Sequence, residues 1–139
     1  MKKLPRVKLT TDHKAQLKKM GVELIYLFGS FAEGFATTHS DIDIGIVFKN
    51  PRRYERNTLK AFVSLHRLFS GVYFTCPEVD IVFLQFAPIA LQAKAVMRGQ
   101  LLFESERGAH VRYIEAVMRH RADLQFFLDR HQQAILARV

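Results

Sequence analysis

Short apolar runs alternate along this chain with amphipathic segments. Three runs are almost entirely apolar and are bounded by glycine, proline or charged residues, which is typical of strands. Between them, apolar positions recur three or four residues apart and predict helices. The pattern predicts strands over Val22–Phe28, Ile42–Phe48 and Val79–Leu84, an edge strand over Leu101–Phe103, and helices over His13–Met20, from Arg52 to about Gly71, and from Pro88 to Gly99. Such a set of elements defines a small α/β (α+β) domain.

A much longer helix is predicted at the end of the sequence. Ser105 can cap a helix from Glu106 to about Arg138, along which apolar residues recur near helical spacing. Most of these residues are expected to face the core. Roughly 33 residues nevertheless make a helix of about 50 Å, which is longer than a domain of this size is wide. We therefore expect part of the helix to project and to present Phe126 and Phe127 to a partner protein or a second copy.

Length and composition favour a single domain over residues 1–139, with a core over about 22–106 and the long helix over about 106–138. No run of about 18 uncharged apolar residues occurs, so no membrane span is expected. The basic first residues are followed by no apolar stretch, which argues against a secretory signal. Cys76 is the only cysteine. No internal disulfide can therefore form, and a cytoplasmic protein is expected.

The chain is basic, with a net charge of +8 from 21 Lys and Arg against 13 Asp and Glu. Such a charge attracts nucleoside triphosphates, nucleic acid or an acidic partner, and it also keeps a protein soluble. The cations are spread along the sequence. The composition therefore leaves these alternatives open, including the direct binding of nucleic acid.

Candidate binding and catalytic residues lie at the end of the first predicted strand and at the start of the second. The first strand ends in Gly29-Ser30, and Asp41-Ile42-Asp43 begins the second. Glycine lets the backbone approach a ligand, Ser30 offers a hydroxyl, and a helix start offers free N–H groups that bind phosphate. Asp41 and Asp43 point to the same face because side chains alternate along a strand. Paired carboxylates favour a cation between them, and Mg²⁺ binds both carboxylate and phosphate oxygens.

A third carboxylate, Asp80, lies near the start of the third predicted strand. If that strand lies beside the second, Asp80 joins the other two acids, and three carboxylates suit a two-metal phosphoryl-transfer site. The roles of two further groups of residues stay open. The cations Arg52, Arg53 and Arg56 either offer charge to a triphosphate or form a solvated helix start. His39 either contacts substrate near the metals or is simply solvated.

The spacing of these acids from Gly29-Ser30 resembles the nucleotidyltransferase superfamily that includes polymerase beta. The short length, with the stretches Asp80–Pro88 and Arg98–Glu104, is similar to its minimal nucleotidyltransferase (MNT) branch, the antitoxins of HEPN/MNT toxin–antitoxin systems. The resemblance covers roughly residues 22 to 106. It implies the polymerase-beta-like fold, with a small mixed sheet and flanking helices.

The resemblance also implies an activity, namely Mg²⁺-dependent transfer of AMP from ATP to an acceptor hydroxyl. In this branch the acceptor is often a tyrosine of a cognate HEPN ribonuclease toxin. Asp41 and Asp43 would hold the metal that carries the β- and γ-phosphates. Asp80 would complete a second metal site and take the proton of the attacking hydroxyl. Gly29 and Ser30 would bind phosphate.

The sequence departs from the pattern just after Ser30, where many relatives carry basic residues and this chain has Phe31-Ala32-Glu33-Gly34. Two other functions stay open. The same fold can neutralise a partner by binding alone, with weak or no catalysis. It can also transfer a nucleotide to a small molecule such as an antibiotic, although such enzymes usually carry a larger acceptor-binding domain. The acceptor, the nucleotide base and the oligomeric state, including a homo-oligomer, are not fixed by the sequence.

Overall fold

Four strands form one mixed sheet in the computed structural model, which describes residues 9–29, 42–72 and 78–138. The order is β3-β2-β1-β4, with β1 antiparallel to both β2 and β4 and with β3 parallel to β2. The predicted mixed sheet is therefore confirmed, and so is the edge strand. The strands are β1 (Val22–Phe28), β2 (Ile42–Phe48), β3 (Val79–Phe83) and β4 (Gln100–Glu104).

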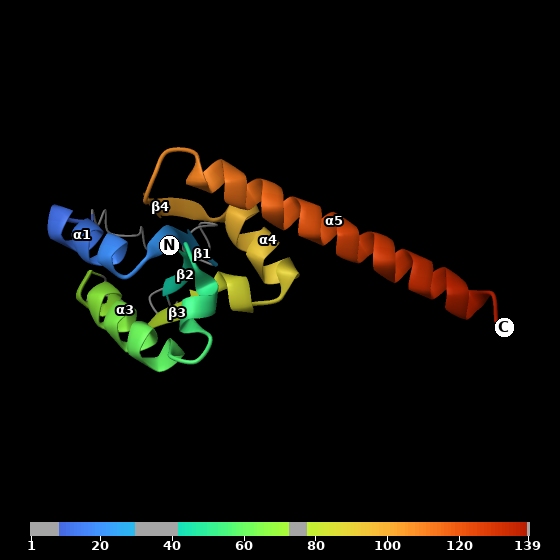
Figure 1. Ribbon diagram of the computed structural model, residues 1–139, viewed down its shortest axis with the longest axis horizontal. Helices are drawn as coiled ribbons and strands as arrows, with labels where there is room; N and C mark the ends of the chain where they lie inside the picture. Colours follow the sequence, from blue (N-terminus) through green and yellow to red (C-terminus); the bar gives the residue numbers. More distant parts are fainter. Residues whose placement is uncertain (1–8, 30–41, 73–77, 139) are drawn as a thin grey trace, which may run out of the picture.

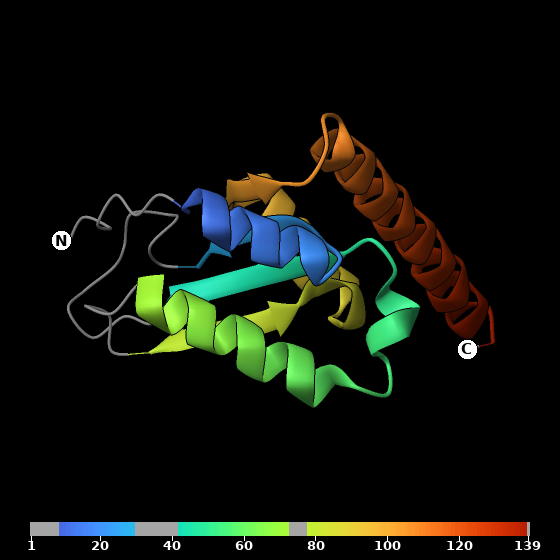
Figure 2. The ribbon, with the colours of Figure 1, turned by 60° about the vertical axis from the view of Figure 1, so that its left-hand side comes forward.

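Helices cover both faces of the sheet (Figures 1 and 2). On one face, α1 (Thr11–Lys19) and α3 (Thr58–Val72) pack on the alternate strand residues that include Ile42 and Ile44. On the other, α4 (Ile89–Arg98) and the first part of α5 pack on residues that include Tyr26. The near-continuous apolar runs of β1 and β2 follow from this double cover, because every position of these two strands except Glu23 and Asp43 is buried.

One predicted helix is divided in two, because the helix expected from Arg52 to Gly71 is a 3₁₀ turn, η1 (Pro51–Tyr54), followed by α3. The ring of Tyr54 stacks on Phe48 with centroids 4.2 Å apart, and its hydroxyl donates to the carbonyl of Met20. Anchoring that side chain under α1 turns the backbone before α3 can begin.

The third strand is also one residue shorter than predicted, because a second 3₁₀ turn, η2 (Leu84–Phe86), follows Phe83. In this turn the side-chain amide of Gln85 pairs with the backbone of Phe48 on β2. It accepts from the N–H at 2.8 Å and donates to the carbonyl oxygen at 2.9 Å. The side chain thus continues the hydrogen bonding of a strand at the point where the β3 backbone turns away.

The helix α5 (Ala109–Leu136) begins later than predicted. Its N-cap is Gly108, in the left-handed region with φ 91°, and Ser105 does not cap it. The Ser105 hydroxyl is instead buried with no hydrogen-bond partner in the described part of the chain. The helix has 28 residues and a length of about 42 Å, against the 50 Å expected.

The projection of α5 is confirmed. Its first turns pack against α4 and β1 through residues such as Val117, whereas every residue from Arg119 to Arg138 is exposed. Figure 1 shows this second half extending away from the sheet. The expectation that most apolar residues of the helix face the core is therefore wrong within this chain. The exposed large side chains of the second half are Leu124, Phe126, Phe127, Leu128, Ile135 and Leu136. None of the helices in the described residues is both long and apolar enough to cross a membrane.

Candidate functional site

Asp43 and Asp80 lie on adjacent parallel strands as direct register partners. Neighbouring strands are about 4.8 Å apart, and residues in register point to the same face. The condition attached to Asp80, that its strand lie beside the second, is thus met. Both side chains are half-buried. Two carboxylates at such close quarters repel one another and favour a cation between them.

The face to which these acids point is the one covered by α4 and α5. Along β2, the even positions Ile42, Ile44 and Ile46 belong to the core under α1 and α3, whereas Val47 belongs to the core under α4 and α5. Asp43 shares the parity of Val47, so it points to the α4 side. The acids lie where β2 and β3 begin, at one end of that face.

Gly29 closes the site from the end of β1. Phe28 is the register partner of Asp43, so Gly29 follows directly beside the carboxylate. Its φ of +80° lies in the left-handed region, and a Cβ built on it would be 2.2 Å from Asp43 Oδ2. Glycine is therefore required at this position both for the backbone conformation and for the space.

The other predicted residues of the turn, Ser30 and Asp41, lie outside the described residues, as does His39. Over the ranges 9–29, 42–72 and 78–138, no three His, Cys, Asp or Glu side chains gather to hold a metal ion. The carboxylates of Asp43 and Asp80 are hard oxygen donors of the kind that Mg²⁺ prefers. The described residues therefore fit a divalent cation as a pair of ligands, with Asp41 as the predicted third.

The arginines considered as phosphate ligands are not part of this site. Arg52, Arg53 and Arg56 follow the far end of β2, where Phe48 lies five residues beyond Asp43, a distance of about 16 Å. They also belong to the layer of α1 and α3, since Arg53 lines a cavity with α3 residues. Of the two alternatives, the solvated turn is the one that the fold supports.

Arg98, a cation that sequence reasoning missed, lies nearer to the site than these arginines. It ends α4, and the following Gly99 packs on β1. A Cβ on Gly99 would be 2.8 Å from the carbonyl oxygen of Leu27, two residues before Gly29. With Lys94 and Arg121, Arg98 lines a cavity of about 290 Å³ between α4 and α5. The signal in the sequence is a cation directly before the glycine that ends a helix.

Two tyrosines on the same side of the sheet anchor α5 rather than serve as exposed hydroxyls. Tyr26 Oη lies 2.6 Å from His110 Nδ1, and the Tyr113 hydroxyl donates to Gln92 Oε1 at 2.7 Å. Burial raises the pKa of both phenols above the ordinary tyrosine value. The anchor fixes the direction in which the second half of α5 leaves the domain.

A glycine turn beside paired carboxylates on a mixed sheet defines a class of protein that binds phosphate esters together with a divalent cation. The model of the family "Polymerase beta, Nucleotidyltransferase" matches residues 13–108, which is more than half of the chain. The chain therefore belongs to the polymerase beta nucleotidyltransferase family.

Solved structures share the fold. A chain of a crystal structure described as a toxin-antitoxin with AMP-PNP has a TM-score of 0.66 at 22% identity, over 91% of this chain and 99% of that one. A chain of the toxin-antitoxin MntA-HepT has a TM-score of 0.58 at 20% identity, over 91% and 99%. A chain from Shewanella oneidensis has a TM-score of 0.51 at 20% identity, over 87% and 92%. A search of curated proteins found no significant match.

Proposed function

We propose that this chain is an antitoxin that transfers AMP from ATP, with Mg²⁺, to a tyrosine hydroxyl of a HEPN ribonuclease toxin in the cytoplasm. The observation that carries the proposal is the register pairing of Asp43 with Asp80 beside Gly29, in a member of the polymerase beta nucleotidyltransferase family. That arrangement would hold phosphate and a divalent cation at one place.

In the transfer, the acceptor oxygen bonds to the α-phosphorus of ATP, the bond from that phosphorus to the bridging oxygen breaks, and pyrophosphate leaves. Asp43 and Asp80 would hold the metal together with Asp41. When bound, Mg²⁺ supplies stabilisation of the negative charge that develops on phosphate oxygens. Asp80 is the candidate acceptor for the hydroxyl proton, and Gly29 and Ser30 would receive phosphate through their N–H and hydroxyl groups.

The partner surface is the exposed second half of α5. Phe126, Phe127 and Leu136 are each 64% exposed, on a segment in which every described residue from Arg119 onward is exposed. Apolar surface of that kind is covered in a complex. Two of the similar folds come from toxin-antitoxin crystal structures, one of them with AMP-PNP. Both observations support a protein acceptor rather than a small molecule.

A second candidate function is neutralisation by binding alone, which the same α5 surface favours because it needs no catalysis. One experiment separates the two functions. The chain is co-purified with the product of its neighbouring gene, and the partner is weighed by intact mass spectrometry with and without ATP and Mg²⁺. AMP transfer predicts a gain of one or more AMP units. A partner that stays bound, has no ribonuclease activity and keeps its unmodified mass would support neutralisation by binding.

The interface has its own test, because the residues that a truncation before Phe126 removes are exposed throughout the described part, up to Arg138. We expect the melting temperature to stay within about 2 °C of the full chain, since no buried area is lost, and partner binding to disappear. Phe127→Ser and Leu124→Ser should weaken binding, whereas the matched polar changes Gln132→Ser and Gln133→Ser should not. A truncated chain that still captures the partner would exclude this surface.

A further inference from the structure

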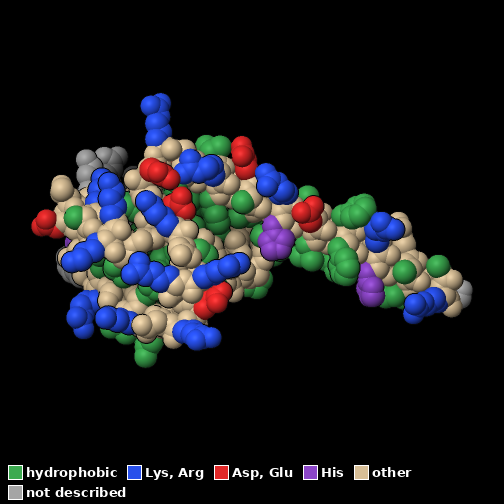
Figure 3. Space-filling view, in the orientation of Figure 1, with side chains coloured by type: hydrophobic (Ala, Val, Ile, Leu, Met, Phe, Trp, Pro, Cys, Tyr) green, Lys and Arg blue, Asp and Glu red, His purple; other side chains and the backbone are tan. Residues whose placement is uncertain are grey.

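Nine of the 17 Lys and Arg residues that the structure describes lie in one layer of the folded chain. Residues 9–20 and 49–72, which hold α1, η1 and α3, carry nine cations and two acids, Asp12 and Glu55, for a net charge of +7. Residues 78–138 carry eight cations and seven acids. Figure 3 shows the blue side chains over this layer. The nine cations, called the basic surface, are Lys14, Lys18, Lys19, Lys49, Arg52, Arg53, Arg56, Lys60 and Arg67.

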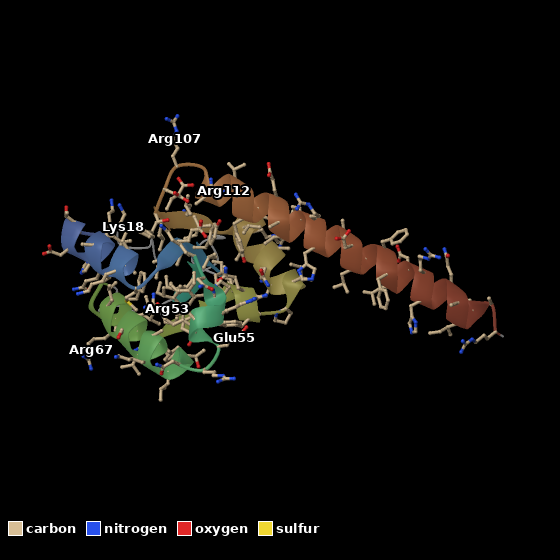
Figure 4. The ribbon with its side chains drawn as sticks, viewed as in Figure 1. Lys18, Arg53, Glu55, Arg67, Arg107 and Arg112 are labelled. Atoms are coloured by element: carbon tan, nitrogen blue, oxygen red, sulfur yellow. The ribbon has the colours of Figure 1, made fainter. Side chains whose placement is uncertain are left out.

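All nine cations are exposed, and none of them forms an ion pair within the described residues. The ion pairs of Arg112 with Glu106 and Glu23 are at the start of α5 instead. Lys18, Arg53 and Arg67 come from three separate elements of one layer (Figure 4). A field of unpaired like charges raises the local potential and attracts polyanions.

The basic surface also holds a shaped site. A cavity of about 290 Å³ between the end of α1, η1 and α3 is lined by the cations Arg53 and Lys60 and by polar side chains that include Asn57 and Ser64. Lys60, Ser64 and Arg67 follow one another at helical spacing on α3, so they lie along one side of it. Cations interleaved with amide and hydroxyl donors are the groups that contact phosphate oxygens in nucleic acids.

The chemistry of the surface favours a nucleic acid over an acidic protein. Protein interfaces have an apolar centre, yet neither α1 nor η1 exposes a large apolar side chain. Those exposed on α3 are Leu59, Phe62 and Val63, and the first two line a different cavity beside β3. Apart from Val63, the basic surface offers charge and hydrogen-bond donors rather than large exposed apolar side chains, which matches a phosphodiester backbone.

We propose that the outer surface of α1, η1 and α3 binds the phosphodiester backbone of a nucleic acid. The surface lies on the opposite face of the sheet from Asp43 and Asp80. It therefore requires no nucleotidyl transfer, and its test measures binding alone, so that its failure is distinct from failure of the proposed activity.

The test uses the full chain and a fluorescein-labelled single-stranded RNA, with DNA of the same sequence as a second probe, in fluorescence anisotropy from about 50 to 200 mM salt. The first variant is Lys18→Gln, Arg53→Gln and Lys60→Gln together. The second combines Lys14→Gln, Lys19→Gln and Arg67→Gln. The matched control removes three exposed cations elsewhere, with Arg107→Gln, Arg119→Gln and Arg138→Gln. All three variants lose the same charge, and circular dichroism melting checks that each is folded.

We expect wild type and control to bind with similar affinity. The two surface variants should bind at least about tenfold more weakly. Each surface variant should also lower the slope of log K against log salt by about 2, because three contacts of about 0.7 each are lost on a single strand. A preference for one probe identifies the source of the backbone as RNA or DNA, and equal binding means that the surface reads only the phosphates that both share.

Three results would overturn the proposal. The first is no binding to either probe at 50 mM salt. The second is an equal loss in the control and in the surface variants, which would make the effect one of net charge. The third is tighter binding of phosphatidylserine vesicles than of either nucleic acid with the same dependence on the variants, since that would assign the surface to a membrane.

Discussion

The two faces of the sheet are built from the same kind of apolar strand, but they carry opposite chemistry. The face under α1 and α3 has a core of Ile, Leu and Phe side chains beneath an outer layer with a net charge of +7. The face under α4 and α5 contains hydrogen-bonded tyrosines and ends in the half-buried pair Asp43 and Asp80. Because side chains alternate along β2, a shift of one residue decides which face of the sheet a side chain lies on.

This difference separates the proposed attraction of polyanions from the proposed binding of a metal and a nucleotide. Cations such as Arg52 and Arg53 follow directly after the strand of Asp43, but the fold places them at the other end and on the other face. Proximity along the sequence therefore says little about which charges act together. The largest expected effects come from changes that touch the acidic site, and smaller ones from the anchors around it.

Asp43→Asn should cause the largest effect. It removes a proposed metal ligand. Even the mutation of a residue that hydrogen-bonds to such a ligand typically lowers metal affinity or activity 10- to 100-fold. We expect a fall of more than about a hundredfold in AMP transfer from labelled ATP, with an unchanged or raised melting temperature, because repulsion from Asp80 is relieved. The triple change of Lys18, Arg53 and Lys60 to Gln should leave transfer unchanged. Full activity in both Asp43→Asn and Asp80→Asn would refute the metal site.

Gly29→Ala tests the packing of the same site against the opposite face. The substitution places a Cβ 2.2 Å from Asp43 Oδ2 at a φ of +80°, so the carboxylate must move and the left-handed backbone costs about 1–2 kcal/mol. We expect that loss of unfolding free energy in urea and at least about tenfold less transfer. Gly71→Ala is the matched control, because Gly71 lies in α3 with nothing within 4 Å of an added Cβ. There the helix should gain up to about 1 kcal/mol.

Much of this architecture could be predicted from the sequence. β1 and β2 have the predicted bounds, because continuous apolar runs between a glycine and charged residues allow few other structures. The helix from Pro88 to Gly99 could be predicted because proline opens it and glycine closes it, and the edge strand expected after it is present. For the site, the parity of Asp43 and the need for Asp80 on a neighbouring strand were predicted, and the register supplied the rest.

What could not be predicted depends on contacts between distant segments. The break between η1 and α3 arises where Tyr54 meets Phe48 and Met20, and no local pattern encodes that contact. The position of Arg98 depends on the packing of Gly99 against β1. The basic surface appears only when α1 and α3 come together, because its cations lie in two stretches of the sequence separated by two strands. Ser30 and Asp41 stay predictions.

Tyr113→Phe tests the anchors on the α4 side. The change leaves Gln92 Oε1 without its donor, which should cost about 1–2 kcal/mol of unfolding free energy. Because burial raises the pKa of Tyr113 and Tyr26, their neutral forms stabilise the fold below the ordinary tyrosine pKa of about 10, and this stability is lost as pH rises above it. At pH 11 wild type should lose up to about 1 kcal/mol for each tyrosine. Urea titrations at pH 8 and 11 should show a smaller loss for Tyr113→Phe. An equal loss would mean that this phenol is not held neutral.

Ser105→Ala gives the smallest effect and separates two starts for α5. If Ser105 capped the helix, as its sequence context suggests, the substitution would cost about 1 kcal/mol. In the structure Gly108 is the N-cap, and the Ser105 hydroxyl is buried with no partner in the described residues. Removing an unsatisfied buried hydroxyl is neutral or stabilising, because the alanine leaves no polar group to desolvate. We therefore expect a change in unfolding free energy between zero and about +1 kcal/mol in urea. Gly108→Ala, at φ +91° with Arg112 Nη1 3.2 Å from the added Cβ, should instead lose about 1–2 kcal/mol. If Ser105→Ala lowered the unfolding free energy and Gly108→Ala did not, Ser105 would be the N-cap and α5 would begin earlier than Ala109.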